Sequence, residues 1–174
     1  MKLRKPPLFV LARAATYASL FVGLLLIAVP GRILERSGIV RPAHLGAVEY
    51  AGIGVAVAGA ALALWCVVTF AWVGRGTPAP FDPPRTLVVQ GPYRYLRNPM
   101  YLGAALALCG AALFYRSIPL LGYAGLFLLA SHGFVAWYEE PTLARVFGAE
   151  YEAYRARVGR WLPRGSRGAR SDTT

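Results

Sequence analysis

Three long apolar stretches set the strongest limit on what this chain can fold into. They cover Leu8–Pro30, Ala47–Val73 and Ile118–Tyr138, and each is long enough to cross a bilayer core, which takes roughly 20 residues of helix. Of all residues, 56% are hydrophobic and only 16% are charged, whereas about a quarter are charged in an average soluble domain. The sequence therefore predicts an all-α integral membrane bundle in a lipid bilayer.

The bundle is predicted to contain about four transmembrane helices. We expect them at Leu8–Val29, Ala47–Val73, Pro99–Tyr115 and Ile118–Tyr138. The breaker pair Pro30-Gly31 is expected to end the first helix. A tight connection at Arg116–Pro119 leaves so few residues between the last two helices that they must form an antiparallel hairpin.

Small residues crowd the first half of the second predicted helix. They are Gly52, Gly54, Ala56, Ala58, Gly59, Ala60 and Ala61. Small side chains let helix backbones approach closely in lipid, where apolar side chains gain little by leaving hydrocarbon. This series predicts close helix packing rather than part of a ligand cleft.

An amphipathic helix is predicted over Leu143–Val158, after the last membrane helix. Its apolar residues recur at spacings of three or four and form one stripe, namely Leu143, Phe147, Tyr151, Tyr154 and Val158. This helix is expected either to lie on the membrane surface or to cap the bundle. We divide the chain into N-terminal helices at 1–73, a functional region at 74–163 and a disordered basic tail at 164–174.

The net charge of +11 predicts membrane orientation rather than nucleic-acid binding. The basic residues lie between and after the apolar stretches, not on one folded face. With the N-terminus inside, most Lys and Arg fall on the inner side, so both termini and the long loop 74–98 are predicted to be cytoplasmic. Cys66 and Cys109 lie inside apolar stretches, which argues against a metal cluster.

Two polar clusters stand out because packing alone does not require them. The first is Gly91-Pro-Tyr-Arg-Tyr-Leu-Arg-Asn-Pro-Met-Tyr-Leu-Gly103. In it Asn98 suits a helix N-cap and Pro99 the first helical turn, and arginine guanidinium groups suit a carboxylate or phosphate. The second is the pair Glu139-Glu140, which is costly at a membrane boundary unless it is solvated or paired.

The predicted hairpin brings these two clusters to the same membrane face. A site for a ligand is one explanation of this arrangement. The alternative is an ion pair between Arg97 and a glutamate that only holds the two helices together. His132 also lies near this end and is expected to be packed or hydrogen-bonded rather than to transfer protons.

Taken in order, the clusters resemble a known family. The pattern Gly-x-Tyr-x-x-x-Arg-His-Pro-x-Tyr-x-Gly, then Glu-Glu, then Phe-Gly-x-x-Tyr-x-x-Tyr is similar to isoprenylcysteine carboxyl methyltransferases and their bacterial relatives, which also resemble phospholipid N-methyltransferases. The resemblance covers about residues 75–163. It implies a membrane-embedded, S-adenosylmethionine-dependent methyltransferase with a lipophilic acceptor, in the bacterial inner membrane and without a metal.

The resemblance also implies which residues surround the cofactor. They are Tyr93, Arg97, Asn98, Pro99, Tyr101, Gly103, Glu139, Glu140 and Tyr154, with Tyr151 on the same C-terminal signature. No catalytic residue is assigned, because transfer of a methyl group from a sulfonium needs mainly positioning and desolvation.

The chain departs from the family pattern at two places. Asn98 stands where the family often has His, and Asn cannot titrate near neutral pH. The segment 132–138 lacks the Arg that eukaryotic members carry for acceptor handling. The acceptor therefore stays open between a carboxylate, an amine and a thiol. A sterol-type membrane reductase and a non-enzymatic helix-packing protein remain as alternatives.

Overall fold

In the computed structural model, residues 16, 19–20, 22–74 and 86–164 are described. This part of the chain is helical and forms no strand, which confirms the all-α prediction. The elements in order are η1 (Val22–Ala28), α2 (Val29–Arg36), α3 (Ala47–Thr69), η2 (Phe70–Gly74), η3 (Gly91–Arg94), α4 (Pro99–Phe114), α5 (Ile118–Phe134), η4 (Val135–Glu139), α6 (Glu140–Phe147) and α7 (Ala149–Arg157).

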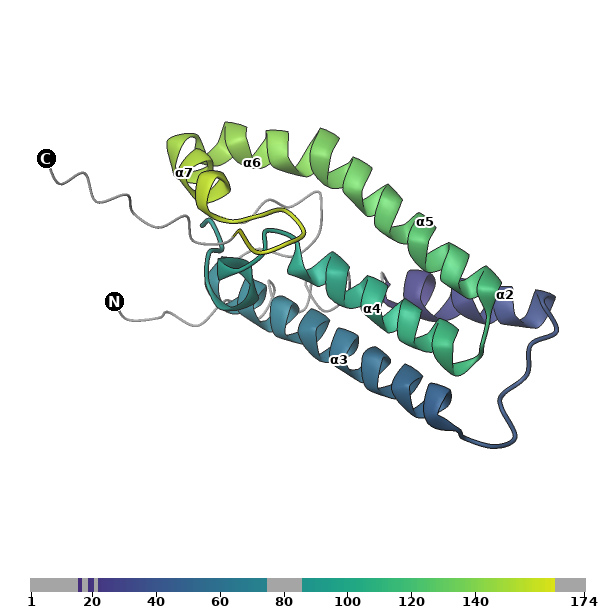
Figure 1. The fold of residues 1–174 in the computed structure, drawn as a ribbon. Helices are drawn as coiled ribbons and strands as arrows, with labels where there is room; N and C mark the ends of the chain where they lie inside the picture. The colour runs from purple at the N-terminus through teal and green to yellow at the C-terminus, as the bar shows by residue number, and fades with distance from the viewer. Residues whose placement is uncertain (1–15, 17–18, 21, 75–85, 165–174) are drawn as a thin grey trace, which may run out of the picture.

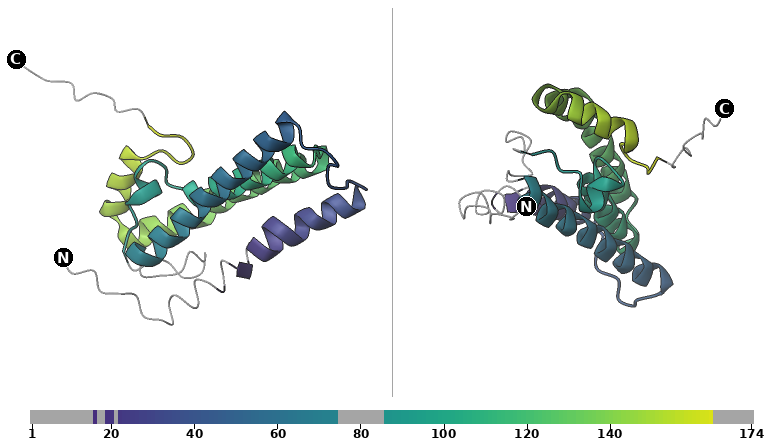
Figure 2. Two further views of the ribbon diagram at one scale, coloured as in Figure 1. Left: turned by 90° about the horizontal axis from the view of Figure 1, so that it is seen from below. Right: turned by 90° about the vertical axis from the view of Figure 1, so that its left-hand side faces the viewer.

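The helices are arranged around α4. Figure 1 shows α3 and α4 side by side, and α5 returning from the far end of α4 and diverging from it toward α6 and α7. Figure 2 shows α2 to one side of this group. It is tied to the group through the preceding turn η1, because the hydroxyl of Tyr123 on α5 donates to the carbonyl oxygen of Leu25 at 3.0 Å.

Glycines let α3 and α4 pack backbone against backbone. A Cβ atom added to Gly52 would lie 2.6 Å from the main-chain nitrogen of Phe114, and one on Gly110 would lie 2.3 Å from that of Ala56. Gly59 and Gly103 meet in the same way farther along the two helices. Any larger side chain would push the helices apart, so the predicted close packing of the small-residue series is confirmed, with α4 as its partner.

Two helical runs are long and apolar enough to cross a membrane. They are Ala47–Gly74, with 28 residues and a mean hydropathy of 2.3, and Ile118–Phe147, with 30 residues and a mean hydropathy of 1.6. The helix Pro99–Phe114 is apolar but shorter. Large side chains such as Leu129 and Trp137 are exposed on these runs, as expected of surfaces that face lipid. Most of the first predicted helix, Leu8–Val29, lies outside the described residues.

The expected helix end at Pro30-Gly31 is wrong. The helix continues through both residues to Arg36, and the loop begins at Ser37. Pro30 closely follows the π-helical run η1, so it lies inside a continuous helical run whose hydrogen-bonding pattern changes just before the proline. Pro30 and Gly31 therefore lie inside a helical run rather than at its end.

The last membrane helix also runs farther than predicted. α5 passes through η4 directly into α6, and Pro141 again follows a π-helical run inside a continuous helix. The helix ends at Gly148, whose φ of +52° is in a region that favours glycine. The single amphipathic helix predicted over Leu143–Val158 is therefore wrong, because it is split between α6 and α7. Its apolar stripe nevertheless packs together, with Tyr151, Tyr154 and Val158 buried against Leu87.

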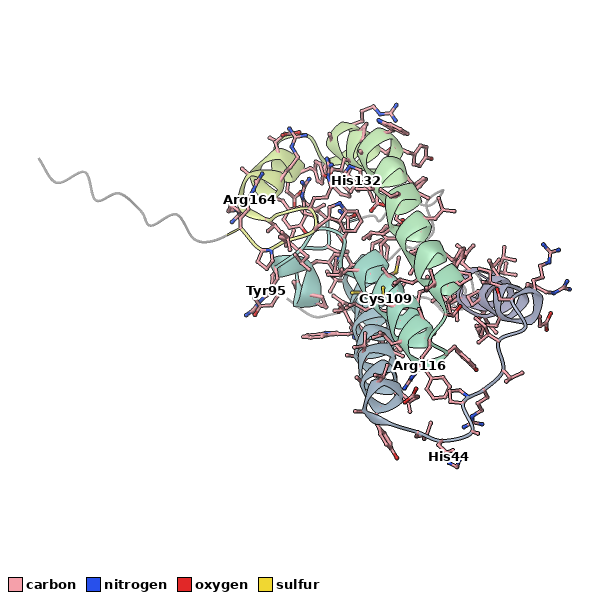
Figure 3. The ribbon with its side chains drawn as sticks, turned by 45° about the vertical axis from the view of Figure 1, so that its right-hand side comes forward. His44, Tyr95, Cys109, Arg116, His132 and Arg164 are labelled. Atoms are coloured by element: carbon pink, nitrogen blue, oxygen red, sulfur yellow. The ribbon has the colours of Figure 1, made fainter. Side chains whose placement is uncertain are left out.

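An ion pair between the buried Glu49 and the exposed Arg116 lies at the end of the bundle opposite α7. Glu49, at the start of α3, accepts from the main-chain N–H of Gly46 at 2.8 Å and from Arg116 Nε at 2.6 Å. Arg116 follows α4, so this carboxylate joins the start of α3 to the turn between α4 and α5. Figure 3 shows Arg116 at this end and His132 and Arg164 toward the other.

Candidate functional site

Glu140 is the centre of the polar contacts at the α6–α7 end of the molecule. Its side chain is 8% exposed and its two oxygens accept from Arg160, with Nε to Oε1 and Nη2 to Oε2 both at 2.7 Å. Arg97 Nη1 lies 2.8 Å from the same Oε1. Hydrogen bonding to Glu140 raises the pKa of Arg160 above its usual value. Two guanidinium groups thus neutralise one buried carboxylate, and the cluster keeps a net positive charge.

Arg97 is buried but incompletely paired. Besides Glu140, its Nη1 donates to the hydroxyl oxygen of Tyr151 over 3.3 Å. Its Nε is buried without a hydrogen-bond partner among the described residues. Buried donors of this kind normally have partners, so Arg97 has one donor to offer a ligand that carries an acceptor.

Asn98 and Pro99 begin α4 as the sequence predicts, but Asn98 does not cap it. The Asn98 side chain accepts no hydrogen bond from the first turn of α4. Instead its Nδ2 donates to the carbonyl oxygen of Arg160 at 3.4 Å. The capping role is therefore wrong, because the buried amide of Asn98 is turned toward the C-terminal segment. Pro99 occupies the first helical turn, as expected.

Tyr93 and Tyr154 connect the η3 turn to α7. The Tyr154 hydroxyl donates to the main-chain oxygen of Tyr93 at 2.6 Å, and both side chains are buried. Burial, reinforced by the nearby Cys66 and Glu139 side chains, raises the pKa of Tyr93 well above its usual value. The phenol of Tyr93 therefore stays neutral at physiological pH.

Glu139 differs from its neighbour in having no ion-pair partner among the described residues. Its Oε2 accepts from the hydroxyl of Tyr101 at 3.2 Å, which joins η4 to the first turn of α4. No guanidinium in the described part of the chain pairs with this carboxylate. The carboxylate is suited to attract a cation, and the rings of Tyr101 and Tyr93 can add cation–π attraction.

The structure thus brings eight of the nine predicted cofactor residues to one end of the molecule. The ninth, Gly103, lies one turn farther along α4, where a Cβ would meet the backbone of Ala63 at 2.8 Å. Its position explains it fully as a helix-packing residue. The predicted alternative, an ion pair between Arg97 and a glutamate, is also present, with Glu140 as the partner.

Sequence reasoning missed Arg160 and Trp161. Both residues lie within the predicted functional region 74–163, but neither was given a role there. The Trp161 Nε1 donates to Nδ1 of His132 at 2.9 Å, and the two rings are stacked. His132 is thus hydrogen-bonded, as expected. The sequence offered one indication of a further partner. A buried carboxylate needs hydrogen-bond donors for both oxygens, and Arg97 alone would not supply them to Glu140.

Comparison with known proteins places this arrangement in a family. The profile of the phospholipid methyltransferase family matches residues 48–150, which is more than half of the chain. The chain belongs to the phospholipid methyltransferase family. No curated protein and no solved structure matches it. The match confirms the predicted relation to membrane methyltransferases, and together with the two long apolar helices it indicates a membrane protein.

The family match begins in α3 and ends in the first turn of α7. It includes the start of α4, the α3–α4 packing and both glutamates. Tyr151, Tyr154 and Arg160 lie just beyond it, although their side chains contact residues inside it. No group of three or more His, Cys, Asp or Glu suited to a metal occurs among the described residues.

Proposed function

We propose that this protein is an S-adenosylmethionine-dependent methyltransferase that acts on a lipophilic acceptor. The observation that carries the proposal is the pair of Glu139 and Arg97: the Glu139 carboxylate accepts from Tyr101 and has no guanidinium partner in the described part of the chain, and the Nε of buried Arg97 has no hydrogen-bond partner there. A carboxylate and aromatic rings suit a sulfonium or an ammonium group, and a guanidinium suits a carboxylate. These are the charged groups of S-adenosylmethionine, so the residues fit this cofactor.

The chain's own residues would contribute position and charge rather than covalent chemistry. S-adenosylmethionine supplies an electrophilic methyl group, which an acceptor attacks in line. Tyr101 fixes Glu139 by its hydrogen bond at 3.2 Å, and Arg160 and Arg97 fix Glu140. Holding the reactants in line and excluding water can supply most of the acceleration of such a transfer.

Asn98 would orient a ligand and not act as a base. An amide does not titrate near neutral pH, so an acceptor that must lose a proton would need another group or water. An amine of a phospholipid is the first acceptor to test, because of the family to which the chain belongs, followed by a lipophilic thiol and a carboxylate. We place the site on the cytoplasmic side of the membrane, following the distribution of Lys and Arg.

Binding of S-adenosylmethionine to the detergent-purified protein, measured by calorimetry, tests the proposal. Glu139→Gln should weaken binding about tenfold, because one charged hydrogen bond or ion pair is worth about 1.5 kcal/mol. Glu152→Gln is the matched control, since Glu152 is half exposed and pairs only with Arg155 on the surface of α7. Absence of binding by the unmodified protein would refute the proposal. Binding of a nicotinamide nucleotide instead would favour the reductase alternative.

Transfer of labelled methyl groups into a lipid extract identifies the acceptor class. The labelled lipids are separated by headgroup, and their label is compared after acid and base hydrolysis. Label that base releases as volatile methanol indicates a methyl ester, whereas label that stays in a non-volatile product indicates an amine or a thioether. Glu139→Gln should lower the rate of transfer and Glu152→Gln should not.

A further inference from the structure

We name the segment Val158–Arg164 the C-terminal strap. It joins the two halves of the candidate site, which are the residues just before α4 and the α5–α6 run. It follows α7 and returns toward the start of α4 (Figure 1). The main-chain N–H of Arg97 donates to the carbonyl oxygen of Gly159 at 2.9 Å, and Leu96 and Gly159 form an isolated parallel bridge. Together with the bond from Asn98 to Arg160, these contacts fix the strap to the residues that precede α4.

The side chains of the strap contact the α5–α6 run, which is the other half of the site. Arg160 holds both oxygens of Glu140 at the start of α6. The next residue, Trp161, donates to His132 near the end of α5 and stacks on it with ring centroids 6.1 Å apart. Two consecutive strap residues therefore contact the α5–α6 run, while the strap's main chain contacts the residues before α4.

Arg97 alone would hold Glu140 less firmly. It reaches a single oxygen of the carboxylate through one nitrogen, which leaves the carboxylate free to rotate. The planar fork of Arg160 fixes both oxygens at once, and a bidentate pair of this kind adds directional specificity that a point charge lacks. Arg160 is 30% exposed on its side chain, so it closes the cluster from the solvent side.

We propose that Arg160 is a positioning residue for the S-adenosylmethionine site. It acts through Glu140 and through the main chain of the strap, and together these fix the start of α4 against the α5–α6 run. This proposal rests on the proposed function. It assigns a role in the site to a segment that lies outside the part of the chain matched by the family profile.

Two substitutions of Arg160 and one control test the proposal. Arg160→Gln should weaken binding of S-adenosylmethionine roughly tenfold to a hundredfold, the range found when groups that orient a metal ligand are removed. Arg160→Lys keeps the charge but loses the fork, so binding should fall between that of Arg160→Gln and that of the unmodified protein. Arg157→Gln removes the same charge from an exposed side chain of α7, whose hydrogen bond within the described part of the chain goes to the carbonyl oxygen of Ala153, and binding should not change.

Amide hydrogen exchange provides a readout that does not depend on the cofactor. The N–H of Arg97 is protected by Gly159, so exchange at this amide should be faster in Arg160→Gln and unchanged in Arg157→Gln. A merely structural role would lower the thermal midpoint without this local change. Unchanged exchange at Arg97 in a folded Arg160→Gln protein would overturn the proposal.

A double substitution separates action through Glu140 from an independent effect. If Arg160 acts through Glu140, Glu140→Gln combined with Arg160→Gln should bind S-adenosylmethionine no more weakly than Glu140→Gln alone. Fully additive losses would overturn the positioning role. If the unmodified protein binds no S-adenosylmethionine, the proposed function itself fails. Full binding by Arg160→Gln would instead overturn the role of Arg160 and leave the proposed function in place.

Discussion

Glu139 and Glu140 are adjacent in the chain but have different surroundings. Glu140 is held by three nitrogen contacts from Arg97 and Arg160, whereas Glu139 accepts one hydrogen bond, from Tyr101. The first carboxylate is fully compensated and the second is not. We therefore expect Glu140 to stabilise this end of the molecule and thereby hold the candidate site in place, and Glu139 to attract a cation directly.

Substituting each glutamate by Gln separates the two roles. Glu140→Gln should lower the free energy of unfolding by roughly 2 to 3 kcal/mol, because it leaves buried guanidinium groups without their counter-charge. Glu139→Gln should change it by less than about 1 kcal/mol, because the Gln amide oxygen can still accept the hydrogen bond from Tyr101. Urea unfolding in detergent micelles measures both. Equal destabilisation by the two substitutions would contradict this division.

The Tyr154 hydroxyl is predicted to stabilise the contact between α7 and η3. Tyr154→Phe leaves the buried carbonyl oxygen of Tyr93 without its donor at 2.6 Å, which should cost about 1 to 2 kcal/mol. Burial raises the pKa of Tyr154 above its usual value, so the hydroxyl stays protonated and the loss should be the same from about pH 6 to pH 9. Unfolding midpoints at several pH values check this. A loss that disappears toward pH 9 would show that the hydroxyl ionises in that range.

Sequence reasoning found these residues as a set but not all their contacts. Polar residues clustered in apolar surroundings pointed to Arg97, Asn98 and the glutamate pair. The pattern could not show that Asn98 turns away from its own helix, because an amide suits a cap and a distant carbonyl equally well. Arg160 was missed since nothing in the local sequence distinguishes it from the other arginines near the C-terminal end.

At the scale of elements, the packing of α3 against α4 predicts opposite effects for two neighbouring glycines. Gly52→Ala should destabilise the protein by about 1 to 3 kcal/mol, because its Cβ would clash with the backbone at Phe114. Gly54→Ala, two residues away on α3, meets nothing within 4 Å and should be neutral or stabilising by up to about 1 kcal/mol. Thermal unfolding of the two variants in the same detergent is the measurement. A similar loss in both would mean that the glycines do not form the contact.

Hydropathy predicted the second, third and fourth helices well, since burial in lipid depends on composition alone. The errors occurred where prolines and a glycine decide the boundaries. The first helix was predicted to end at Pro30 and the last membrane helix at Tyr138, just before Pro141, although each proline lies inside a continuous helical run. Gly148 was read as part of a helix but takes a positive φ. Whether a proline starts or ends a helix depends on the preceding residues' tertiary contacts, which sequence periodicity does not contain.

At the scale of the whole molecule, the apolar runs Ala47–Gly74 and Ile118–Phe147 predict firm membrane integration. The protein should stay in the membrane pellet after washing with alkaline carbonate or high salt, and detergent should release it. Electrostatic binding of a basic protein to anionic lipid would be reversed by salt, because screening shortens the range of the attraction. A soluble pool after the salt wash would contradict integration. The measurement is an immunoblot of the pellet and the supernatant.

The position of Arg160 in the chain also has a consequence for biogenesis. Glu140 precedes its bidentate partner by 20 residues, and α7 has to be made before Arg160 can reach it. During synthesis the Glu140 carboxylate can therefore pair with Arg97 but not yet with Arg160, until translation has passed α7. The membrane helices can enter the bilayer earlier, but this end of the protein reaches its final form only as a late step, once the ribosome has released Arg160.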